Sequence, residues 1–278
     1  MALVPFRKTG TSSVDDDLDP DHDADDLHDP AGKMSFLDHL DELRKRIVRA
    51  VIAIFAGVIV AFFFIQHVFD FIMKPLQATL PAGGRLVYTE PTEAFVLYIK
   101  IAGIAGLLLA SPVVFAQVWG FIAPGLYKNE RKMAVPFVVL STIFFVTGAA
   151  FSHYVVFPMA WKFFVGFTSD YLAFMPRIEP AFSMYLKLLL GMGLVFQMPT
   201  LVLFLARFGI VTAGWMLKNL KYAILIIFIV SAVVTPGGDP MSQTAMAIPM
   251  VLLYFISIFL AWVFGKKKRT PDAEPSES

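Results

Sequence analysis

Two glutamates stand among basic residues in short segments that flank apolar stretches of the chain. Glu42 lies in HLDELRKR, His39 to Arg46, and Glu130 lies in QVWGFIAPGLYKNERK, Gln117 to Lys132. A carboxylate surrounded by lysine and arginine can neutralise its neighbours, or it can bind a cationic partner such as a guanidinium group. Taken singly, neither glutamate decides between these two interpretations.

The segment around Glu42 has the pattern of an amphipathic helix. Ser35–Arg49 places apolar residues at helical intervals on one face and charged residues on the other, with Ser35 as a possible N-cap. We expect this helix to run directly into an apolar stretch. An alternative to a binding role is an interfacial helix whose basic residues set the membrane topology.

The sequence offers no support for catalysis. It contains no cysteine, which excludes disulfides, thiolate metal ligands and cysteine nucleophiles. It also lacks a phosphate-binding loop, a cluster of metal ligands and a nucleophile arrangement. A net charge of +1, segregated along the chain, argues against nucleic acid. We therefore predict a protein that is not an enzyme and holds no cofactor and no metal.

The elements that position these residues are predicted to be membrane-spanning helices. Hydrophobic residues make up 57% of the chain and charged residues only 16%, which indicates an all-α integral membrane protein. A span needs roughly 20 mostly apolar residues. Six candidates meet or approach this length: Ile47–Ile65, Ala94–Ala123, Ala134–Phe157, Phe182–Leu205, Tyr222–Val234 and Ala245–Phe264.

Basic residues predict that both termini are cytoplasmic, because loops rich in lysine and arginine stay on that side. They gather before the first span, after every second span and after the last. The residues are Arg44, Lys45, Arg46, Arg49, Lys128, Arg131, Lys132, Arg207, Lys218, Lys221 and the cluster Lys266–Arg269.

Two features of the predicted spans are unusual. The fifth span offers only about 20 Å of helix, which is short for a bilayer. Several spans contain proline, at Pro112, Pro136, Pro199 and Pro249, and we expect these prolines to bend their helices. Six bent spans would also suit a secondary transporter of a small solute. The lack of an internal repeat and of ionisable groups inside the spans argues against that alternative.

A few polar residues lie within the spans, as Gln197 does near the middle of the fourth, or beside their outward ends. Gln197, directly before the Met-Pro pair of the fourth span, should face protein or water because an unpaired amide in hydrocarbon is costly. It either binds a partner helix or satisfies a carbonyl freed by Pro199. Asp239 and Gln243, in the last outward connector, are expected to cap a helix or contact a partner. His153 is expected to be a satisfied interfacial histidine.

Residues 1–33 and 266–278 lie outside the predicted membrane domain, 34–265. The first segment contains a dense acidic run, Asp15–Asp26, without apolar periodicity, and the second begins basic and ends in Pro, Glu and Ser. Both are predicted to be disordered cytoplasmic extensions.

Three further motifs follow the two segments around Glu42 and Glu130: VVFPMA at Val155–Ala160, FQMP at Phe196–Pro199 and TPGGDPMSQTAMAIPM at Thr235–Met250. Together and in this order, the five motifs resemble the TatC family, the core receptor of the twin-arginine protein translocase. The resemblance covers all six predicted spans. It implies a glove-like, concave bundle that binds the twin-arginine signal peptides of folded precursor proteins.

The resemblance assigns roles to individual residues. Glu42 and Glu130 match the family's twin-arginine recognition site, and a carboxylate suits the planar donor fork of a guanidinium. Leu43, Arg44 and Phe121 match residues that frame the same surface, although Arg44 is also a topology charge and Phe121 an interfacial anchor. Pro75, in the first outward connector, matches a proline for which we expect a structural role.

Gln197 departs from the family, since many members carry glutamate at this position. Glutamine cannot ionise, so the residue cannot carry a proton here. The resemblance further implies partners: TatA, TatB, other TatC copies and the lipid bilayer. It also implies export driven by the proton-motive force in the bacterial cytoplasmic (inner) membrane.

Overall fold

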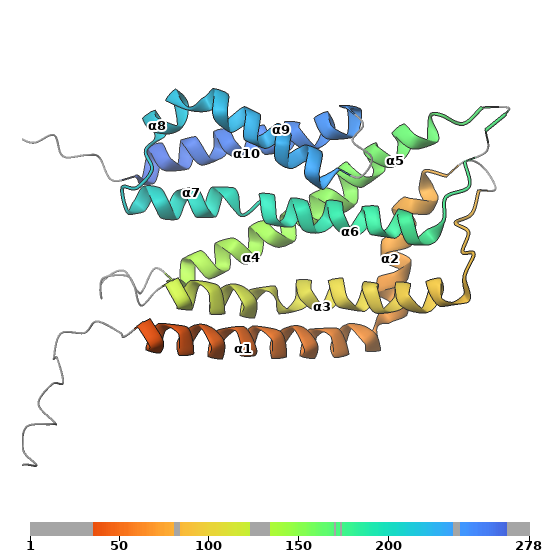
Figure 1. The fold of residues 1–278 in the computed structure, drawn as a ribbon, viewed down its shortest axis with the longest axis horizontal. Helices are drawn as coiled ribbons and strands as arrows, with labels where there is room; N and C mark the ends of the chain where they lie inside the picture. The colour runs from red at the N-terminus through yellow and green to blue at the C-terminus, as the bar shows by residue number, and fades with distance from the viewer. Residues whose placement is uncertain are drawn as a thin grey trace, which may run out of the picture. The chain divides into compact units, whose positions relative to one another are not determined.

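The computed structural model describes residues 36–80, 84–122, 134–169, 171–172, 174–235 and 240–265. Contacts divide the chain into two units, Met1–Asp41 and Glu42–Ser278, and all packing reported below lies within the second. Apart from two isolated β-bridges, the regular structure of the described residues is helical (Figure 1). The predicted all-α class is confirmed.

The helices follow the predicted apolar stretches closely. In chain order they are α1 Phe36–Phe63, α2 Ile65–Ala78, α3 Pro91–Ile122, α4 Ala134–Phe151, the π-helical turn η3 Ser152–Val156, α5 Phe157–Val165, α6 Ile178–Val195, α7 Met198–Arg207, α8 Ala213–Lys218, α9 Leu220–Val234 and α10 Pro240–Phe264. The amphipathic segment continues into the first apolar stretch as the single helix α1, as predicted.

Among the described residues, five helical segments are long and apolar enough to cross a membrane, counting α4–η3–α5 and α6–α7 as one segment each. The chain is therefore a multi-pass membrane protein. The expected fifth span, α9, has 15 residues, or about 22 Å of helix, so its shortness is confirmed. The count of six spans stays a prediction.

Proline acts differently at different positions. The helix is interrupted before Pro199, between α6 and α7, and a π-helical turn precedes Pro158. By contrast, α3 and α10 run without a break through Pro112 and Pro249. Pro136 falls in the first turn of α4, where the missing N–H has no intrahelical partner to lose.

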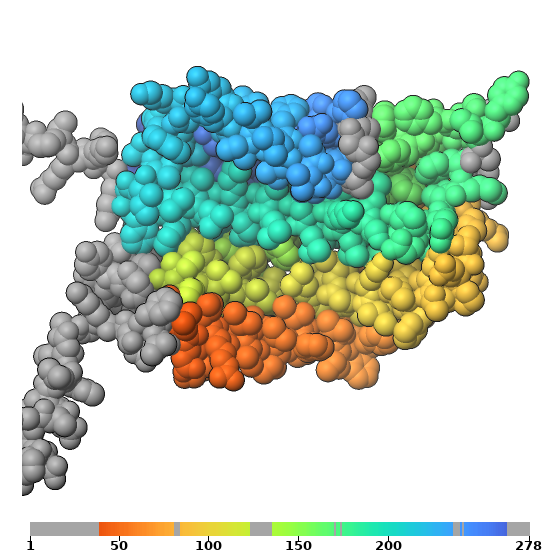
Figure 2. Space-filling view, viewed as in Figure 1, coloured from red at the N-terminus to blue at the C-terminus, as the bar shows by residue number. Residues whose placement is uncertain are grey.

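The core lies where α3, α4, α6, α7 and α10 pack against one another. Its largest fully buried side chains include Phe157, Phe182, Tyr185, Met246 and Met250. In contrast, α1 is mostly uncovered, with exposed side chains such as Ile52 and Phe55 along its length (Figure 2). An apolar exposed face of this kind suits contact with lipid.

Glycines bring α1 and α3 together. A Cβ atom at Gly57 would collide with the backbone carbonyl of Gly106, and one at Gly106 would collide with Val58. The two backbones can therefore approach only because neither position carries a side chain, as is typical of helix pairs in membranes. This crossing fixes the position of α1, which carries Glu42.

Candidate functional site

Glu42 lies on the second turn of α1 and forms an ion pair with Arg46, one turn further along. Its Oε1 atom accepts hydrogen bonds from Nε and Nη2 of Arg46, at 2.9 and 2.6 Å. Both side chains are about four-fifths buried, at 20% and 21% exposure. The other carboxylate oxygen, Oε2, is buried and has no hydrogen-bond partner in the part of the chain that the structure describes.

The last turns of α3 complete this cluster. A Cβ atom at Gly120 would collide with Nη1 of Arg46, so the guanidinium lies directly against the α3 backbone. Phe121 is half-buried beside it, and the Oε1 atom of Gln117 is buried with no partner among the described residues. The start of α1 and the end of α3 therefore hold two buried acceptor atoms to which no described residue donates, and a buried acceptor without a donor costs free energy.

Of the residues predicted for this site, the structure brings Glu42 and Phe121 to these two neighbouring helix ends. Leu43 is half-buried and Arg44 is exposed on the same turn of α1. Glu130 lies outside the described residues, in the connector between the end of α3 and the start of α4.

Sequence reasoning missed three members of the cluster. Arg46 was considered only as a topology charge, and its separation of four residues from Glu42 was the signal for an ion pair. Gln117 and Gly120 lie in the quoted motif around Phe121. Their burial and the approach of Arg46 depend on how α1 crosses α3, which the spacing does not reveal.

Gln197 lies in the break between α6 and α7 and is 9% exposed. Its Nε2 atom donates to the backbone carbonyl of Ser141 on α4, at 2.9 Å. The hydroxyl of Ser141 in turn accepts a hydrogen bond from the Trp119 indole at 2.8 Å. Gln197 thus joins α4 within the same chain, and its amide donates to that helix rather than to a carbonyl freed by Pro199.

The remaining predicted residues have structural contacts. Pro75 lies inside helix α2, so the first outward connector is not a simple loop. The carbonyl of Pro75 accepts a hydrogen bond from the Thr79 hydroxyl at 3.1 Å. Gln243 donates to the Phe228 carbonyl at 3.0 Å and accepts the Ser231 hydroxyl at 2.5 Å, which ties α10 to α9. Asp239 lies outside the described residues.

A second charged cluster, also missed from the sequence, lies at the other end of α3. Glu93, in its first turn, is buried and pairs with Arg177, and both its oxygens also accept hydrogen bonds from Thr89. The hydrogen bond and the charge of Glu93 raise the pKa of the Arg177 guanidinium.

The same end of the protein is joined by two further contacts. Lys100 pairs with Glu179 at 2.9 Å, which links α3 to α6. The backbone N–H of Val87 donates to the Pro176 carbonyl at 3.1 Å, and the Val87 carbonyl accepts from the N–H of Ile178 at 2.9 Å, which joins the two connectors. We call Glu93, Arg177, Lys100 and Glu179 the outer latch, because they hold two connectors and two helices together on the side predicted to face outward.

His153 is buried in η3, where its Nδ1 atom lies 3.0 Å from the hydroxyl of Tyr185. The histidine is therefore satisfied, and its interfacial position stays a prediction. Among the described residues, no group of acidic, histidine or cysteine side chains could hold a metal ion.

The fold and this site define a class: a multi-pass helical membrane protein in which a buried carboxylate oxygen at one end of the bundle has no donor among the described residues. Comparison with known proteins makes the class specific. Residues 38–249 match the family model described as Sec-independent protein translocase protein (TatC). The chain belongs to this family.

Individual relatives with similar sequences carry the same family name. The chain is 44% identical over 248 residues to Sec-independent protein translocase protein TatC of Koribacter versatilis. This alignment covers 88% of this chain and 91% of the relative. The chain is 42% identical over 246 residues to the same protein of Desulforapulum autotrophicum, with the same coverage. These relatives are named as components of protein transport rather than as enzymes.

Solved structures resemble the fold as well. A crystal structure of the twin-arginine translocase receptor TatC superposes with a TM-score of 0.70 at 36% identity, covering 80% of this chain and 97% of that chain. A second crystal structure of the receptor, in DDM, gives a TM-score of 0.71 at 35% identity and covers 82% of this chain and 100% of that chain. The predicted resemblance to TatC is confirmed.

Proposed function

We propose that this chain is the signal-peptide receptor and assembly core of a twin-arginine translocase. It binds the twin-arginine signals of folded precursor proteins for export across the bacterial cytoplasmic membrane, driven by the proton-motive force. Both termini are cytoplasmic in this proposal. Family membership and the receptor function named for the two crystal structures support it.

The observation that carries the proposal is the state of the Glu42 carboxylate. Oε1 is occupied by Arg46, which rests on Gly120, while Oε2 is buried without a donor among the described residues. A cationic peptide with planar N–H donors supplies what Oε2 lacks. Arginine suits this geometry better than lysine, because its guanidinium presents several donors in a fixed plane.

The other site residues take supporting roles. Glu130 supplies the second carboxylate from the connector that follows Phe121, so that two carboxylates meet two arginines. Phe121 offers an aromatic face to a guanidinium or to the apolar part of the signal. Leu43 and Arg44 frame the site on α1.

Partner contacts form elsewhere on the chain. TatA, TatB and further TatC copies are the proposed partners, and a surface around α9 and α10 suits short single-span helices because α9 itself is short. Gln243 holds α9 against α10 there, and Asp239 precedes α10. Gln197 and Pro75 act through the packing of the chain itself.

The decisive experiment measures binding of a fluorescent twin-arginine signal peptide, and of its twin-lysine variant, to the purified full chain in detergent. Glu42→Gln keeps the shape of the side chain and removes its charge. A hydrogen bond to a charged group contributes about 1.5–3 kcal/mol, so affinity for the twin-arginine peptide should fall roughly 10- to 100-fold. Glu130→Gln should act in the same direction.

Glu90→Gln is the matched control, because Glu90 is an exposed carboxylate just before α3, at the end far from Gly120. It should bind the peptide as the wild type does. Equal affinity for the arginine and lysine peptides in the wild type, or unchanged affinity in Glu42→Gln, would contradict the proposal.

A further inference from the structure

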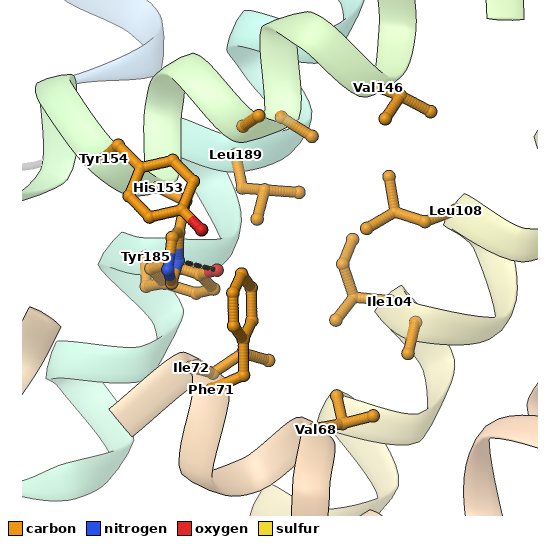
Figure 3. Close-up of a pocket in the computed structure, with 13 residues that line it drawn as sticks. Val68, Phe71, Ile72, Ile104, Leu108, Val146, His153, Tyr154, Tyr185 and Leu189 are labelled. Carbon is orange, nitrogen blue, oxygen red and sulfur yellow. Dashed lines mark hydrogen bonds between the residues drawn. The ribbon is translucent and has the colours of Figure 1, made fainter. Parts of the chain in front are cut away.

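An apolar cavity of about 220 Å³ lies between α2, α3, α4–η3 and α6. Figure 3 shows its lining side chains, with Leu108 and Val146 at one end and the hydrogen-bonded pair of His153 and Tyr185 at the other. The ring of Phe71 stacks on His153 at 4.4 Å between centroids. The cavity opens to the surface, because Phe71 and Tyr154 are 48% and 64% exposed.

A second cavity of about 400 Å³ adjoins the first, since both are lined by Phe71, His153 and Tyr154. This second cavity is more polar, and its lining includes Lys74 and Pro158. The two cavities meet at the stacked Phe71 and His153 rings, and the pair of them forms a groove that is apolar at the Leu108 end and cationic at the Lys74 end. We call it the α2–α4 groove.

The length of the groove matches one leaflet of a bilayer. Val146 and Pro158 lie 12 positions apart along α4, η3 and α5, which is roughly 18 Å of helix. The hydrocarbon of a single leaflet is about 15 Å deep, half of a core of about 30 Å. An acyl chain in the apolar part would therefore place its headgroup near Lys74.

Charge selects the headgroup. Lys74 is exposed and has no ion-pair partner among the described residues. Asp70, one turn earlier on α2, lines neither cavity. An ammonium at the mouth of an apolar groove complements a lipid headgroup with net negative charge.

We propose that the α2–α4 groove binds one anionic phospholipid, with an acyl chain between α3 and α4 and the headgroup at Lys74. This inference does not rest on the proposed receptor function, because the groove contains none of the residues assigned to signal-peptide binding.

The test uses native mass spectrometry of the full chain with added phosphatidylglycerol or phosphatidylcholine of identical acyl chains. The wild type should retain phosphatidylglycerol about fivefold more than phosphatidylcholine, the ratio expected from one lysine near a lipid phosphate. Lys74→Gln should bind both lipids equally. Ala150→Phe, which places a ring in the apolar part from an exposed position, should retain neither.

Two control variants separate the groove from the rest of the surface. Lys162→Gln removes another exposed lysine of the predicted outward side, and Val139→Phe adds a ring at an exposed position of α4 outside the groove. Both should keep the wild-type preference, and soluble glycerol phosphate should not displace the lipid.

Three results would overturn the proposal. They are equal retention of the two lipids by the wild type, an unchanged preference in Lys74→Gln, and displacement of the lipid by a twin-arginine signal peptide. The last result would mean that the groove holds the apolar part of the cargo signal instead.

Discussion

Glu42 and Glu93 lie near opposite ends of α3, and their surroundings differ in one decisive respect. Both oxygens of Glu93 are occupied, by Arg177 and Thr89, whereas Glu42 has one oxygen held by Arg46 and one without a donor in the described part of the chain. The outer latch is thus a completed structural contact. The cluster at Glu42 is an incomplete one.

This difference teaches how one residue type can serve two purposes in the same helical bundle. A carboxylate that is satisfied within the chain joins elements, because breaking its contacts leaves a buried charge. A carboxylate that is only half satisfied can accept an external donor at little cost to the fold. The predictions below test whether binding and stability separate in this way between the two ends.

The largest effect is expected from Gly57→Leu at the crossing of α1 and α3. A side chain there collides with the backbone of Gly106, which cannot move without displacing a helix. We expect signal-peptide binding to fall below detection and the free energy of unfolding to fall by about 1–3 kcal/mol. Peptide titration and thermal melting check both expectations.

Gly103→Leu is the matched control for that change, since a Cβ atom at Gly103 meets nothing within 4 Å. It should bind the peptide as the wild type does. Normal binding by Gly57→Leu would show that the contact between α1 and α3 does not position Glu42.

A smaller and more selective effect is expected from Gly120→Ala. The added methyl group meets the end of the flexible Arg46 side chain, so Arg46 must leave α3 while the backbone stays in place. We expect the affinity for a twin-arginine peptide to fall several-fold with an unchanged melting temperature. A lower melting temperature with unchanged affinity would contradict this expectation. It would mean that the contact between Arg46 and Gly120 stabilises the fold and does not support peptide binding.

The outer latch should show the opposite behaviour. Glu93→Gln removes the charge that pairs with Arg177 and should lower the melting temperature by a few degrees. Signal-peptide affinity should stay within about twofold of the wild type, since any rearrangement is confined to residues far from Glu42. Glu90→Gln, three positions earlier and exposed, serves as the control. A loss of peptide binding in Glu93→Gln would mean that the two ends of α3 are coupled.

The smallest effect is expected from Gln197→Leu, which removes the hydrogen bond to the Ser141 carbonyl. Hydrogen bonds between helices in membranes contribute about 0.6 kcal/mol on average, so the free energy of unfolding should fall by about that amount. Peptide affinity should not change. A loss of binding without a loss of stability would instead indicate that Gln197 contacts a partner.

Much of the fold could be predicted because a bilayer constrains the chain so strongly. Apolar stretches became helices with boundaries close to the expected ones, and the short helix α9 was expected from its length. Helix α2 was missed because its 14 residues are too few to span a bilayer. The expected bends at Pro112 and Pro249 do not interrupt the helices.

The site could be predicted only in part. The motif around Glu42 pointed to the carboxylate, whose binding role stays a prediction, while the places of Arg46, Gln117 and Gly120 in the cluster required the position of α1 against α3. The sequence by itself determined the helices and the family, because hydrophobic length and motif order are local properties of the chain. Only the tertiary structure decided which carboxylate oxygen receives no hydrogen bond from the described residues, because that depends on donors that distant residues bring to it or withhold.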